Sequence, residues 1–235
     1  MEYPALSPRL AAIAGMVTAG RRVADIGTDH ALLPAYLVGT GKAPSAIAAD
    51  IVPGPLAAAS EQVQKYRLSD RITLIQCDGL AKIPPEKAEE IIIAGMGGEL
   101  IARILGEWPY SRNPGRRFLL QPMTKSEVLR QFLSEEGFRI EEEQAVCEGE
   151  RVYTVLAVRF VGKDGISPGE KTPCYYHFGK HPGSADRASA LWMERERLRL
   201  LRRRDGLVAS GKEPDPVLLS LIAAADAALA GFLEE

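Results

Sequence analysis

The 235-residue sequence has no run of about 18 uninterrupted apolar residues, the length that a membrane-spanning helix requires. Its three cysteines are odd in number and show no Cys-x-x-Cys spacing, so they predict neither a disulfide framework nor a zinc knuckle. With only three histidines as well, we expect no metal site. Neither charge sign dominates, because 29 Lys and Arg stand against 31 Asp and Glu. We therefore expect a soluble, cytoplasmic protein.

The N-terminal segment could be mistaken for a targeting signal, because residues 10–20 are apolar and follow a basic residue. Its apolar residues instead recur at spacings of four, three and four between Leu6 and Val17, which is one stripe of an amphipathic helix. Ser7 and Pro8 fit the N-cap and the first position of that helix. We therefore predict a helix rather than a cleaved leader.

Short apolar runs rich in β-branched residues alternate with helical segments between residues 21 and 160. The predicted strands are residues 23–26, 46–51, 72–76, 91–94 and 118–121. The predicted helices are residues 31–38, 55–66, 99–105 and 125–136. This alternation predicts parallel strands joined by crossover helices, a doubly wound α/β sheet. Such a sheet binds ligands beyond the carboxyl ends of its strands, so the site residues should follow each strand.

Two extended runs, residues 138–146 and 151–160, break this alternation and predict an antiparallel hairpin. A parallel sheet finished by such a hairpin is the strand plan of class I methyltransferases, although other α/β folds also mix strand directions. We therefore assign residues 1–161 to a Rossmann-like domain and residues 162–235 to a linker followed by a helical domain.

The linker is predicted at residues 162–184, which are rich in Gly, Pro, Lys and Ser. Residues 187–208 and 216–233 then predict two helices, separated by Gly206 and by residues 211–216. One side of the first helix carries Leu191, Leu198 and Leu201. Two helices joined by a short loop predict an antiparallel, coiled-coil-like pair.

The first predicted strand ends in the run D-I-G-T-D-H at residues 25–30. A dinucleotide-binding turn needs G-x-G-x-x-G, because only glycine lets a pyrophosphate approach the backbone. Gly27 stands alone here, and Asp29 occupies the place of the second glycine, where its charge would repel a pyrophosphate. NAD and FAD are therefore disfavoured. An acidic turn with Asp25 and Asp29 suits the ammonium and sulfonium of S-adenosylmethionine instead.

Acidic residues also follow the second and third predicted strands. Asp50, with Ile51 beside it, lies where a carboxylate accepts hydrogen bonds from both hydroxyls of an adenosine ribose. The alternative is that Asp50 only caps the next helix. Asp78, followed by Gly79, would accept a hydrogen bond from an adenine amino group. Carboxylates after three successive strands together indicate an adenosine-bearing cofactor.

The fourth predicted strand runs into a glycine-rich loop, A-G-M-G-G at residues 94–98. Such a loop has little side-chain bulk, so a flat ring can approach its backbone closely. The alternative is a tight turn packed under the next helix. The N-P-P-Y-like loop of amino-group methyltransferases that act on DNA and some RNAs is missing here.

Four segments are more specific than a generic Rossmann turn. They are V-A-D-I-G-T-D-H-A at residues 23–31, I-A-G-M-G-G at residues 93–98, the pair Gln121 and Pro122, and L-S-P-R-L at residues 6–10. Together they resemble the bacterial tRNA adenine-22 N1-methyltransferase family, over residues 5 to about 160. A helical C-terminal extension is also expected in that family.

The resemblance implies that S-adenosylmethionine is the cofactor and that N1 of an adenine in the D-arm region of tRNA receives the methyl group. It implies these cofactor-binding residues: Asp25, Gly27, Thr28 and His30 at the methionine end, Asp50 and Ile51 at the ribose, Asp78 and Gly79 at the adenine, and Gly95, Met96, Gly97 and Gly98 at the cofactor and target base. Arg9 and Asp29 are implied as catalytic residues that face the reacting adenine. Gln121 and Pro122 are implied as substrate contacts.

The expected chemistry needs little acid or base catalysis. N1 of adenine has an in-plane lone pair, so it attacks the sulfonium methyl without first losing a proton. As positive charge passes to the purine ring, Asp29 would stabilise it or accept a hydrogen bond from N6. Because N1 lies on the Watson–Crick edge, the nucleotide must be unpaired or extruded first. His30 is expected in the wall of the cofactor site rather than as an acid or base.

Basic residues are clustered despite the formal net charge of -2. Residues 187–204 contain seven arginines against two glutamates, and a second basic cluster precedes the fifth predicted strand. Contacts of this kind with phosphates dominate the affinity of nucleic-acid binding. The expected tRNA contacts are Arg116, Arg117, Arg195, Arg199, Arg202 and Arg203. The alternative for the arginine run is a solvated helix face.

Two other functions stay open on the sequence alone. One is a class I methyltransferase that acts on a small molecule or a protein, with the helices as a lid or a dimerisation arm. The other is a non-catalytic adenosine-binding module whose helices recruit a partner. For the favoured function we expect a monomer that binds tRNA.

Overall fold

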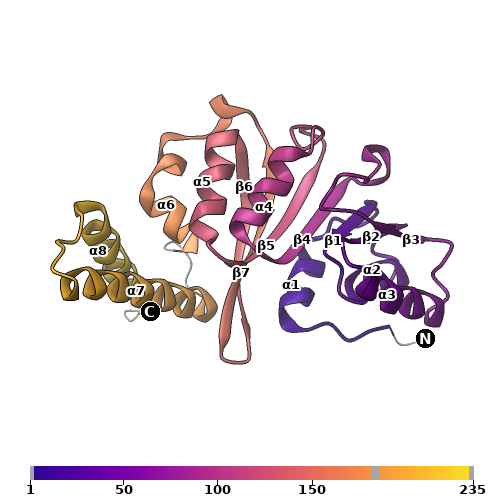
Figure 1. The fold of residues 1–235 in the computed structure, drawn as a ribbon, viewed down its shortest axis with the longest axis horizontal. Helices are drawn as coiled ribbons and strands as arrows, with labels where there is room; N and C mark the ends of the chain where they lie inside the picture. The colour runs from indigo at the N-terminus through magenta and orange to yellow at the C-terminus, as the bar shows by residue number, and fades with distance from the viewer. Residues whose placement is uncertain (1–2, 182–185, 233–235) are drawn as a thin grey trace.

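The computed structural model describes residues 3–181 and 186–232, in which helices cover both faces of a central sheet (Figure 1). Within these residues the sheet has seven strands in the order β3-β2-β1-β4-β5-β7-β6. They are β1 (Val23–Ile26), β2 (Ala46–Asp50), β3 (Ile72–Gln76), β4 (Glu90–Gly97), β5 (Arg117–Thr124), β6 (Phe138–Glu148) and β7 (Arg151–Phe160). β1 to β5 are parallel, and β7 is antiparallel to both β5 and β6. This confirms the predicted class I methyltransferase arrangement.

Two helix layers bury the two faces of the sheet. The helices around it are α1 (Pro8–Met16), α2 (Leu32–Gly39), α3 (Pro53–Lys65), α4 (Gly98–Glu107) and α5 (Ser126–Glu136). Ile91 and Ile93 of β4 lie in a core shared with α4 and α5, whereas Ile92 lies in a second core with α1, α2 and α3. Because both faces are covered, the parallel strands read as continuous apolar runs, which is how the sequence predicted them.

Three of the predicted strands, β1, β3 and β7, begin and end at the predicted residues, whereas β4 and β5 run longer than predicted. β4 continues to Gly97 because an irregularity after Ala94 lets it keep pairing with β5 as far as Thr124. The predicted start of α1 is confirmed, since the Ser7 hydroxyl accepts the Leu10 N–H at 3.5 Å.

The predicted linker instead contains ordered elements. They are η2 (Lys163–Gly165), η3 (Pro168–Lys171) and α6 (Pro173–Phe178). The Thr172 hydroxyl caps α6 by accepting the Tyr175 N–H at 3.2 Å, and Phe178 is buried. A threonine followed by a proline is an N-terminal helix signal that the composition argument overlooked. The last residues of the predicted linker, 182–184, lie outside the described residues.

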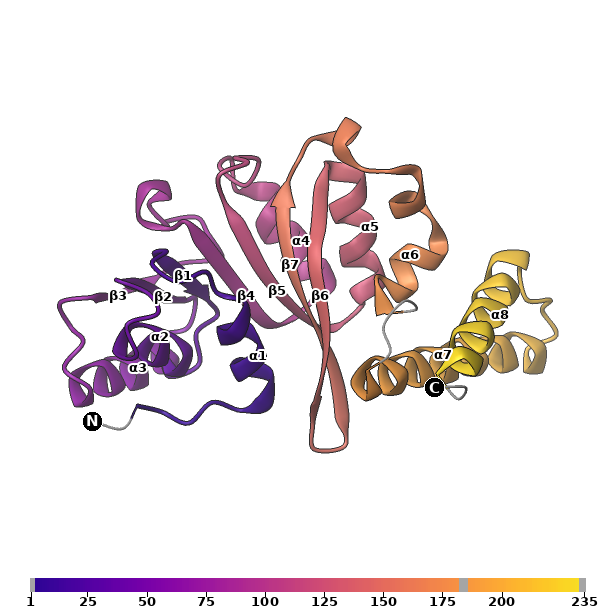
Figure 2. The same cartoon turned by 180° about the vertical axis from the view of Figure 1, so that it is seen from behind.

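The C-terminal helices are α7 (Arg187–Ala209) and α8 (Pro216–Gly231), and α8 folds back along α7 (Figures 1 and 2). Their shared core includes Trp192 and Met193 of α7, whereas Leu191 and Leu198 are exposed. Gly206 does not separate the helices as expected, because it lies inside α7. The predicted last residue of α8, Leu233, lies outside the described residues.

The hairpin of β6 and β7 projects toward the start of α7 (Figures 1 and 2). Its strands stay paired as far as Glu148 and Arg151, so the predicted four-residue connection shrinks to Gly149 and Glu150. The Arg195 guanidinium of α7 donates to the Val152 carbonyl at 2.5 Å. This contact joins the arm formed by α7 and α8 to the hairpin.

A buried charged cluster also holds the base of this arm. Arg130 of α5 and Glu143 of β6 have fully buried side chains, and their nearest N and O atoms are 2.6 Å apart. The His181 ring lies 3.5 Å from Glu143 and within hydrogen-bond distance of Ser189 in α7. The ring also stacks on Trp192, with centroids 4.6 Å apart. We call these five residues the arm joint.

In the part of the chain that the structure describes, the helices are too short or too polar to cross a membrane.

Candidate active site

A cleft of about 280 Å³ lies at the carboxyl ends of β1 and β4, beside α1. It is lined by Arg9, Leu10, Asp25, Gly27, Asp29, Leu32, Leu33, Ala94, Gly95 and Met123. The structure thus brings together five of the predicted site residues from three separate segments. α1 closes one side of the cleft because it supplies Arg9 and Leu10.

The turn after β1 has an uncommon backbone. Gly27 has a φ of 74°, and the non-glycine residues His30 and Ala31 have φ values of 57° and 51°. Such left-handed residues cost energy and cluster at functional sites. The turn leaves the Asp29 side chain 83% exposed, with one oxygen 3.2 Å from His30 Nε2.

Asp25 lies at the buried end of the cleft and accepts a hydrogen bond from the Thr28 hydroxyl at 2.7 Å. The pKa of Asp25 is raised to about 6, chiefly by burial and also by the nearby Asp50 and Asp29, against the lowering effects of Thr28 and Arg9. Thr28 is itself buried, so its described contact is with Asp25 rather than with the cleft. The cleft therefore concentrates negative charge where a cation would stabilise it.

Asp50, at the end of β2, does not cap α3 as the alternative had it, because the N-cap of that helix is Val52 and has no side-chain cap. Its Oδ1 accepts the Val52 N–H at 2.7 Å, just before α3 begins. The neighbouring Ile51 and Val52 are more than half exposed. Asp50 thus combines a local turn contact with a position close enough to Asp25 to affect its pKa.

Asp78 and Gly79, after β3, do not line this cleft. They line a separate cavity of about 250 Å³ together with Ile104 and Trp108. Asp78 Oδ1 lies 3.3 Å from an Arg103 nitrogen of α4, so this carboxylate is paired. The three carboxylates therefore lie at or just after the ends of successive strands, but they do not share a site. Asp25 lines the cleft, Asp78 lines the second cavity, and Asp50 lines neither of them.

The glycine-rich segment predicted as a loop is the end of β4, which continues directly into α4, and it combines both roles that the sequence left open. Gly95, with a φ of 79°, lines the cleft. A Cβ added to Gly98 would lie 2.2 Å from the Lys125 carbonyl oxygen, so this glycine is needed for tight packing. Gly97 is the N-cap of α4, and the Met96 methyl group packs where a Cβ on Gly27 would lie.

Gln121 does not face the cleft, because its side chain is fully buried beneath it. Its Oε1 accepts hydrogen bonds from Arg9 Nη1 at 2.8 Å and from the Gly95 N–H at 3.0 Å. Its Nε2 donates to the Pro122 carbonyl at 2.9 Å. Gln121, which we expected to contact the substrate, instead fixes two walls of the cleft. Pro122 lines a neighbouring cavity with Arg195.

Two residues around Arg9 were missed by sequence reasoning. The Arg9 N–H donates to Glu148 Oε2 at 3.1 Å, and its guanidinium lies 5.8 Å from the centre of the Tyr153 ring. Both partners come from the β6–β7 hairpin, about 140 residues away in the chain, and no local pattern indicates such a pairing. Met123 could have been found, because it follows a predicted strand.

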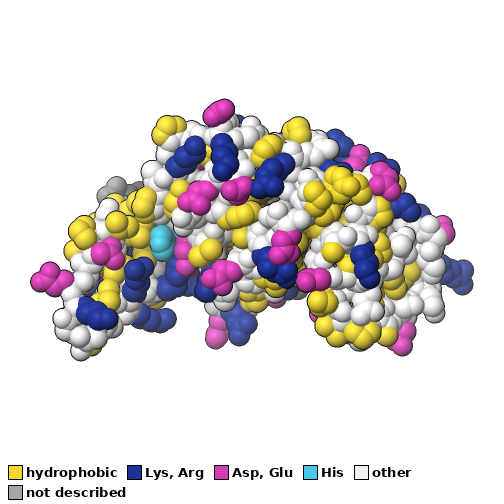
Figure 3. Space-filling view, turned by 45° about the horizontal axis from the view of Figure 1, so that its top comes forward, with side chains coloured by type: hydrophobic (Ala, Val, Ile, Leu, Met, Phe, Trp, Pro, Cys, Tyr) yellow, Lys and Arg dark blue, Asp and Glu magenta, His cyan; other side chains and the backbone are white. Residues whose placement is uncertain are grey.

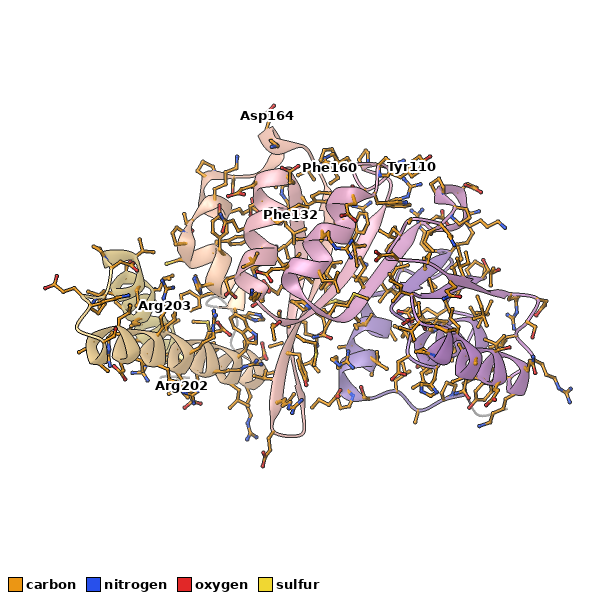
Figure 4. All side chains as sticks on the ribbon, in the orientation of Figure 1. Tyr110, Phe132, Phe160, Asp164, Arg202 and Arg203 are labelled. Atoms are coloured by element: carbon orange, nitrogen blue, oxygen red, sulfur yellow. The ribbon has the colours of Figure 1, made fainter. Side chains whose placement is uncertain are left out.

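The structure does not bring Arg116 and Arg117 to this site. They lie where β5 begins, at the end of the parallel strands away from the cleft. Arg116 contacts Tyr110, which Figure 4 labels. Arg116 is buried over the Trp108 ring and donates to the Tyr110 and Pro85 carbonyls. Arg117 lies within 4 Å of three glutamates. Local packing and pairing occupy both side chains, so we assign them no substrate contact.

The arginines of α7 differ in their availability. Arg199 contacts Glu127 and Glu196, and Arg195 is tied to the hairpin. Arg203 is 58% exposed and lies 3.6 Å from Asp215, and Arg202 is exposed. Figure 4 shows Arg202 and Arg203 well along α7, away from the sheet. In Figure 3, Lys and Arg side chains are visible at this end of the molecule and also over the rest of the face shown.

The strand order and an acidic cleft at the carboxyl ends of the strands define a Rossmann-like class I methyltransferase fold. A family model described as a methyltransferase domain matches residues 6–156. The chain is 40% identical over 166 residues to the Bacillus subtilis tRNA (adenine(22)-N(1))-methyltransferase. The matched region covers 69% of this chain and 70% of that protein. The chain therefore belongs to the tRNA (adenine(22)-N(1))-methyltransferase family.

Solved structures agree over almost the whole chain. The crystal structure of the B. subtilis m1A22 tRNA methyltransferase matches with a TM-score of 0.78 at 29% identity, covering 98% of each chain. A Streptococcus pneumoniae protein assigned as a tRNA (m1A22) methyltransferase, solved in complex with S-adenosyl-L-methionine, matches with a TM-score of 0.82 at 31% identity. That match covers 96% of this chain and 100% of the other.

Proposed function

We propose that this protein transfers a methyl group from S-adenosylmethionine to N1 of adenine 22 in the D-arm region of tRNA. The observation that carries the proposal is the cleft at the carboxyl ends of β1 and β4, where Asp25 and Asp29 face Arg9. Family membership supplies the substrate, because the related B. subtilis enzyme is a tRNA (adenine(22)-N(1))-methyltransferase.

The residues of the cleft fit this cofactor. A buried carboxyl group whose pKa is raised to about 6, with two further carboxylates nearby, favours a positively charged ligand. Gly27 and Gly95 present backbone without side chains to the same space. We assign Asp25 and His30 to the methionine end, Asp50 with Ile51 to the ribose, and the cavity of Asp78 and Gly79 to the adenine end.

S-adenosylmethionine supplies an electrophilic methyl group on a positively charged sulfur. The chain's own residues then position the acceptor, because N1 already has a free lone pair. Asp29 is exposed at the cleft, so its carboxylate can stabilise the positive charge that develops on adenine. Gln121 holds the Arg9 guanidinium at the cleft wall. In the part of the chain described, no group of His, Cys, Asp and Glu could hold a metal ion.

For tRNA we assign the exposed Arg202 and Arg203 to phosphate contacts. Arg195 and Arg199 support α7 instead, through their contacts with the hairpin, Glu127 and Glu196. The arm and the cleft lie at the same end of the parallel strands, so one bound RNA can reach both (Figures 1 and 2).

We also propose that the protein is a cytoplasmic monomer. Its three cysteines are unpaired thiols, as suits a reducing compartment, and the proposed tRNA substrate is cytoplasmic.

The proposal is tested by incubating the protein with methyl-labelled S-adenosylmethionine and unmodified bulk tRNA, then digesting the RNA to nucleosides. Label in 1-methyladenosine is the expected result. Absence of label despite tight cofactor binding would contradict the proposal and favour a methyltransferase with a small-molecule or protein substrate, or an adenosine-binding module.

A further inference from the structure

A groove of about 700 Å³ lies between α7 and the tip of the β6–β7 hairpin. Met123 and Thr124, at the end of β5, line its inner part, together with hairpin residues and one side of α7. Figures 1 and 2 both show the hairpin tip beside the start of α7. The groove is larger than the cleft and lies in the range of pockets that hold organic ligands.

The α7 side of the groove is apolar although it is exposed to solvent. Leu191 and Leu198 line it, with 38% and 41% of their surface exposed. Their spacing of seven residues puts them on the same face of the helix, two turns apart. Trp192 and Met193 already fill the buried side of α7, so these leucines are not needed for the core. Apolar side chains left exposed along a groove indicate a binding surface.

The groove is continuous with the cleft. Met123 lines both cavities. Tyr153 lines the groove, and the Arg9 guanidinium that lines the cleft lies over its ring. A polymer whose reacting group enters the cleft therefore places its neighbouring unit at the groove.

The groove has no excess of positive charge. Arg151 and Arg195 line it together with Glu150 and Glu194. A phosphate would be repelled by the glutamates as much as it is attracted by the arginines. The chemistry of the groove favours an uncharged, mainly apolar group instead.

We propose that this groove binds the base of an unpaired nucleotide next to adenine 22, an inference that rests on the proposed function. Extruding the target adenine removes a stacking partner from its neighbour. An apolar groove one unit away from the cleft replaces that partner, because burying the flat face of a base against the leucines of the groove does not require a particular base. The groove thus holds the RNA by a contact that does not depend on charge.

The test compares Leu191→Ser/Leu198→Ser with the control Val217→Ser/Leu219→Ser. Val217 and Leu219 are 49% and 48% exposed on α8, and they do not line the groove. Affinity for unmodified tRNA is measured by fluorescence anisotropy over a range of salt concentrations. The same tRNA with abasic nucleotides on both sides of adenine 22 is measured in parallel. Thermal melting serves as the control that both variants are folded.

We expect the groove variant to lose about tenfold in affinity at every salt concentration, the effect of losing the apolar contact with one base, with the control unchanged. The wild type should bind the abasic tRNA about tenfold more weakly than the unmodified tRNA. The groove variant should bind both tRNAs with the same affinity, because its contact is already lost. Wild-type affinity in the groove variant would overturn the proposal, as would a changed salt dependence, which would indicate a phosphate. A wild-type dimer in light scattering that the groove variant turns into a monomer would also overturn it.

A different result would contradict the proposed function itself. Wild-type protein that binds this tRNA but leaves adenine 22 unmethylated would contradict that function, whatever the groove variant does.

Discussion

The cleft and the arm joint are two charged clusters with opposite electrostatics. In the cleft, Asp25 is buried near Asp50 and Asp29, and its pKa is raised to about 6. In the arm joint, burial alone would raise the pKa of Glu143, but the charge of Arg130 and the contact with His181 outweigh it, so that pKa lies well below its usual value. One cluster gathers like charges, whereas the other pairs opposite ones.

The difference separates a binding site from a structural support. Every oxygen of Glu143 has partners within the chain: Oε1 accepts from Thr154 and Arg130, and Oε2 accepts from the Lys180 N–H at 2.9 Å. Asp29, in contrast, is exposed, and its one described partner is a half-exposed histidine. A cluster whose charges the chain compensates needs no ligand, whereas one whose charges it leaves in excess is completed by a cation.

The largest effect is expected from breaking the arm joint. Glu143→Gln leaves the Arg130 charge buried without its partner, so the free energy of unfolding should fall by about 3–5 kcal/mol. The control Glu142→Gln, on the same strand but 57% exposed, should change it by less than about 1 kcal/mol. Urea unfolding at neutral pH measures both. Equal effects would show that the arm joint contributes no more than a surface pair.

Asp25→Asn should raise the free energy of unfolding at neutral pH, whereas Glu143→Gln lowers it. Folded Asp25 keeps its proton up to a pH of about 6, whereas its ordinary pKa is 3.8, so wild-type stability falls as pH rises between these values. Above that range the variant should be more stable than the wild type by up to about 3 kcal/mol. Its affinity for S-adenosylmethionine should drop, as isothermal titration calorimetry can measure.

The surface variant Asp70→Asn is the control and should change neither quantity. An Asp25→Asn protein that is less stable than the wild type at neutral pH would contradict the electrostatic account of the cleft.

Asp29→Ala sharpens the comparison by separating binding from turnover. Its exposed carboxylate stabilises charge only during transfer, so we expect turnover on tRNA to fall roughly 100-fold. Affinity for the cofactor should stay within a few-fold. His30→Ala, the matched control in the same turn, should weaken cofactor affinity more than turnover. Steady-state kinetics with titration of the cofactor gives both quantities, and unchanged turnover would remove Asp29 from the mechanism.

The smallest effect is expected from the exposed end of α7. Arg202→Glu with Arg203→Glu should weaken tRNA binding several-fold and flatten its dependence on salt by about one contact per residue. Lys65→Glu, exposed on α3 beyond the other end of the sheet, should leave binding unchanged. Anisotropy titrations at several salt concentrations test this, and equal slopes for wild type and variant would assign the arginines to the solvated face instead.

The sequence predicts the sheet and the acidic turn well because both depend on local patterns. Buried parallel strands are mainly apolar runs, and the acidic residues lie at the end of one of them, with Asp25 inside β1 and Asp29 just after it. Their placement in one cleft follows from the topology.

Long-range partners could not be predicted in this way. Arg9 meets Glu148 and Gln121 from distant segments. Arg130 and His181, which are also far apart in the sequence, both contact Glu143. Nothing in the run of arginines distinguishes those that pair within the protein, such as Arg199, from those left exposed. Composition also misled at residues 162–181, because glycine and proline there begin and end short helices instead of forming a loop.

The most direct test of the central claim uses two tRNAs that differ in one atom. In one, position 22 is adenosine, and in the other it is 1-deazaadenosine, which has a C–H in place of N1. The account predicts that both bind equally and that only the adenosine form gains label from methyl-labelled S-adenosylmethionine. Label in the 1-deaza tRNA, or in neither, would contradict transfer to N1 of adenine 22.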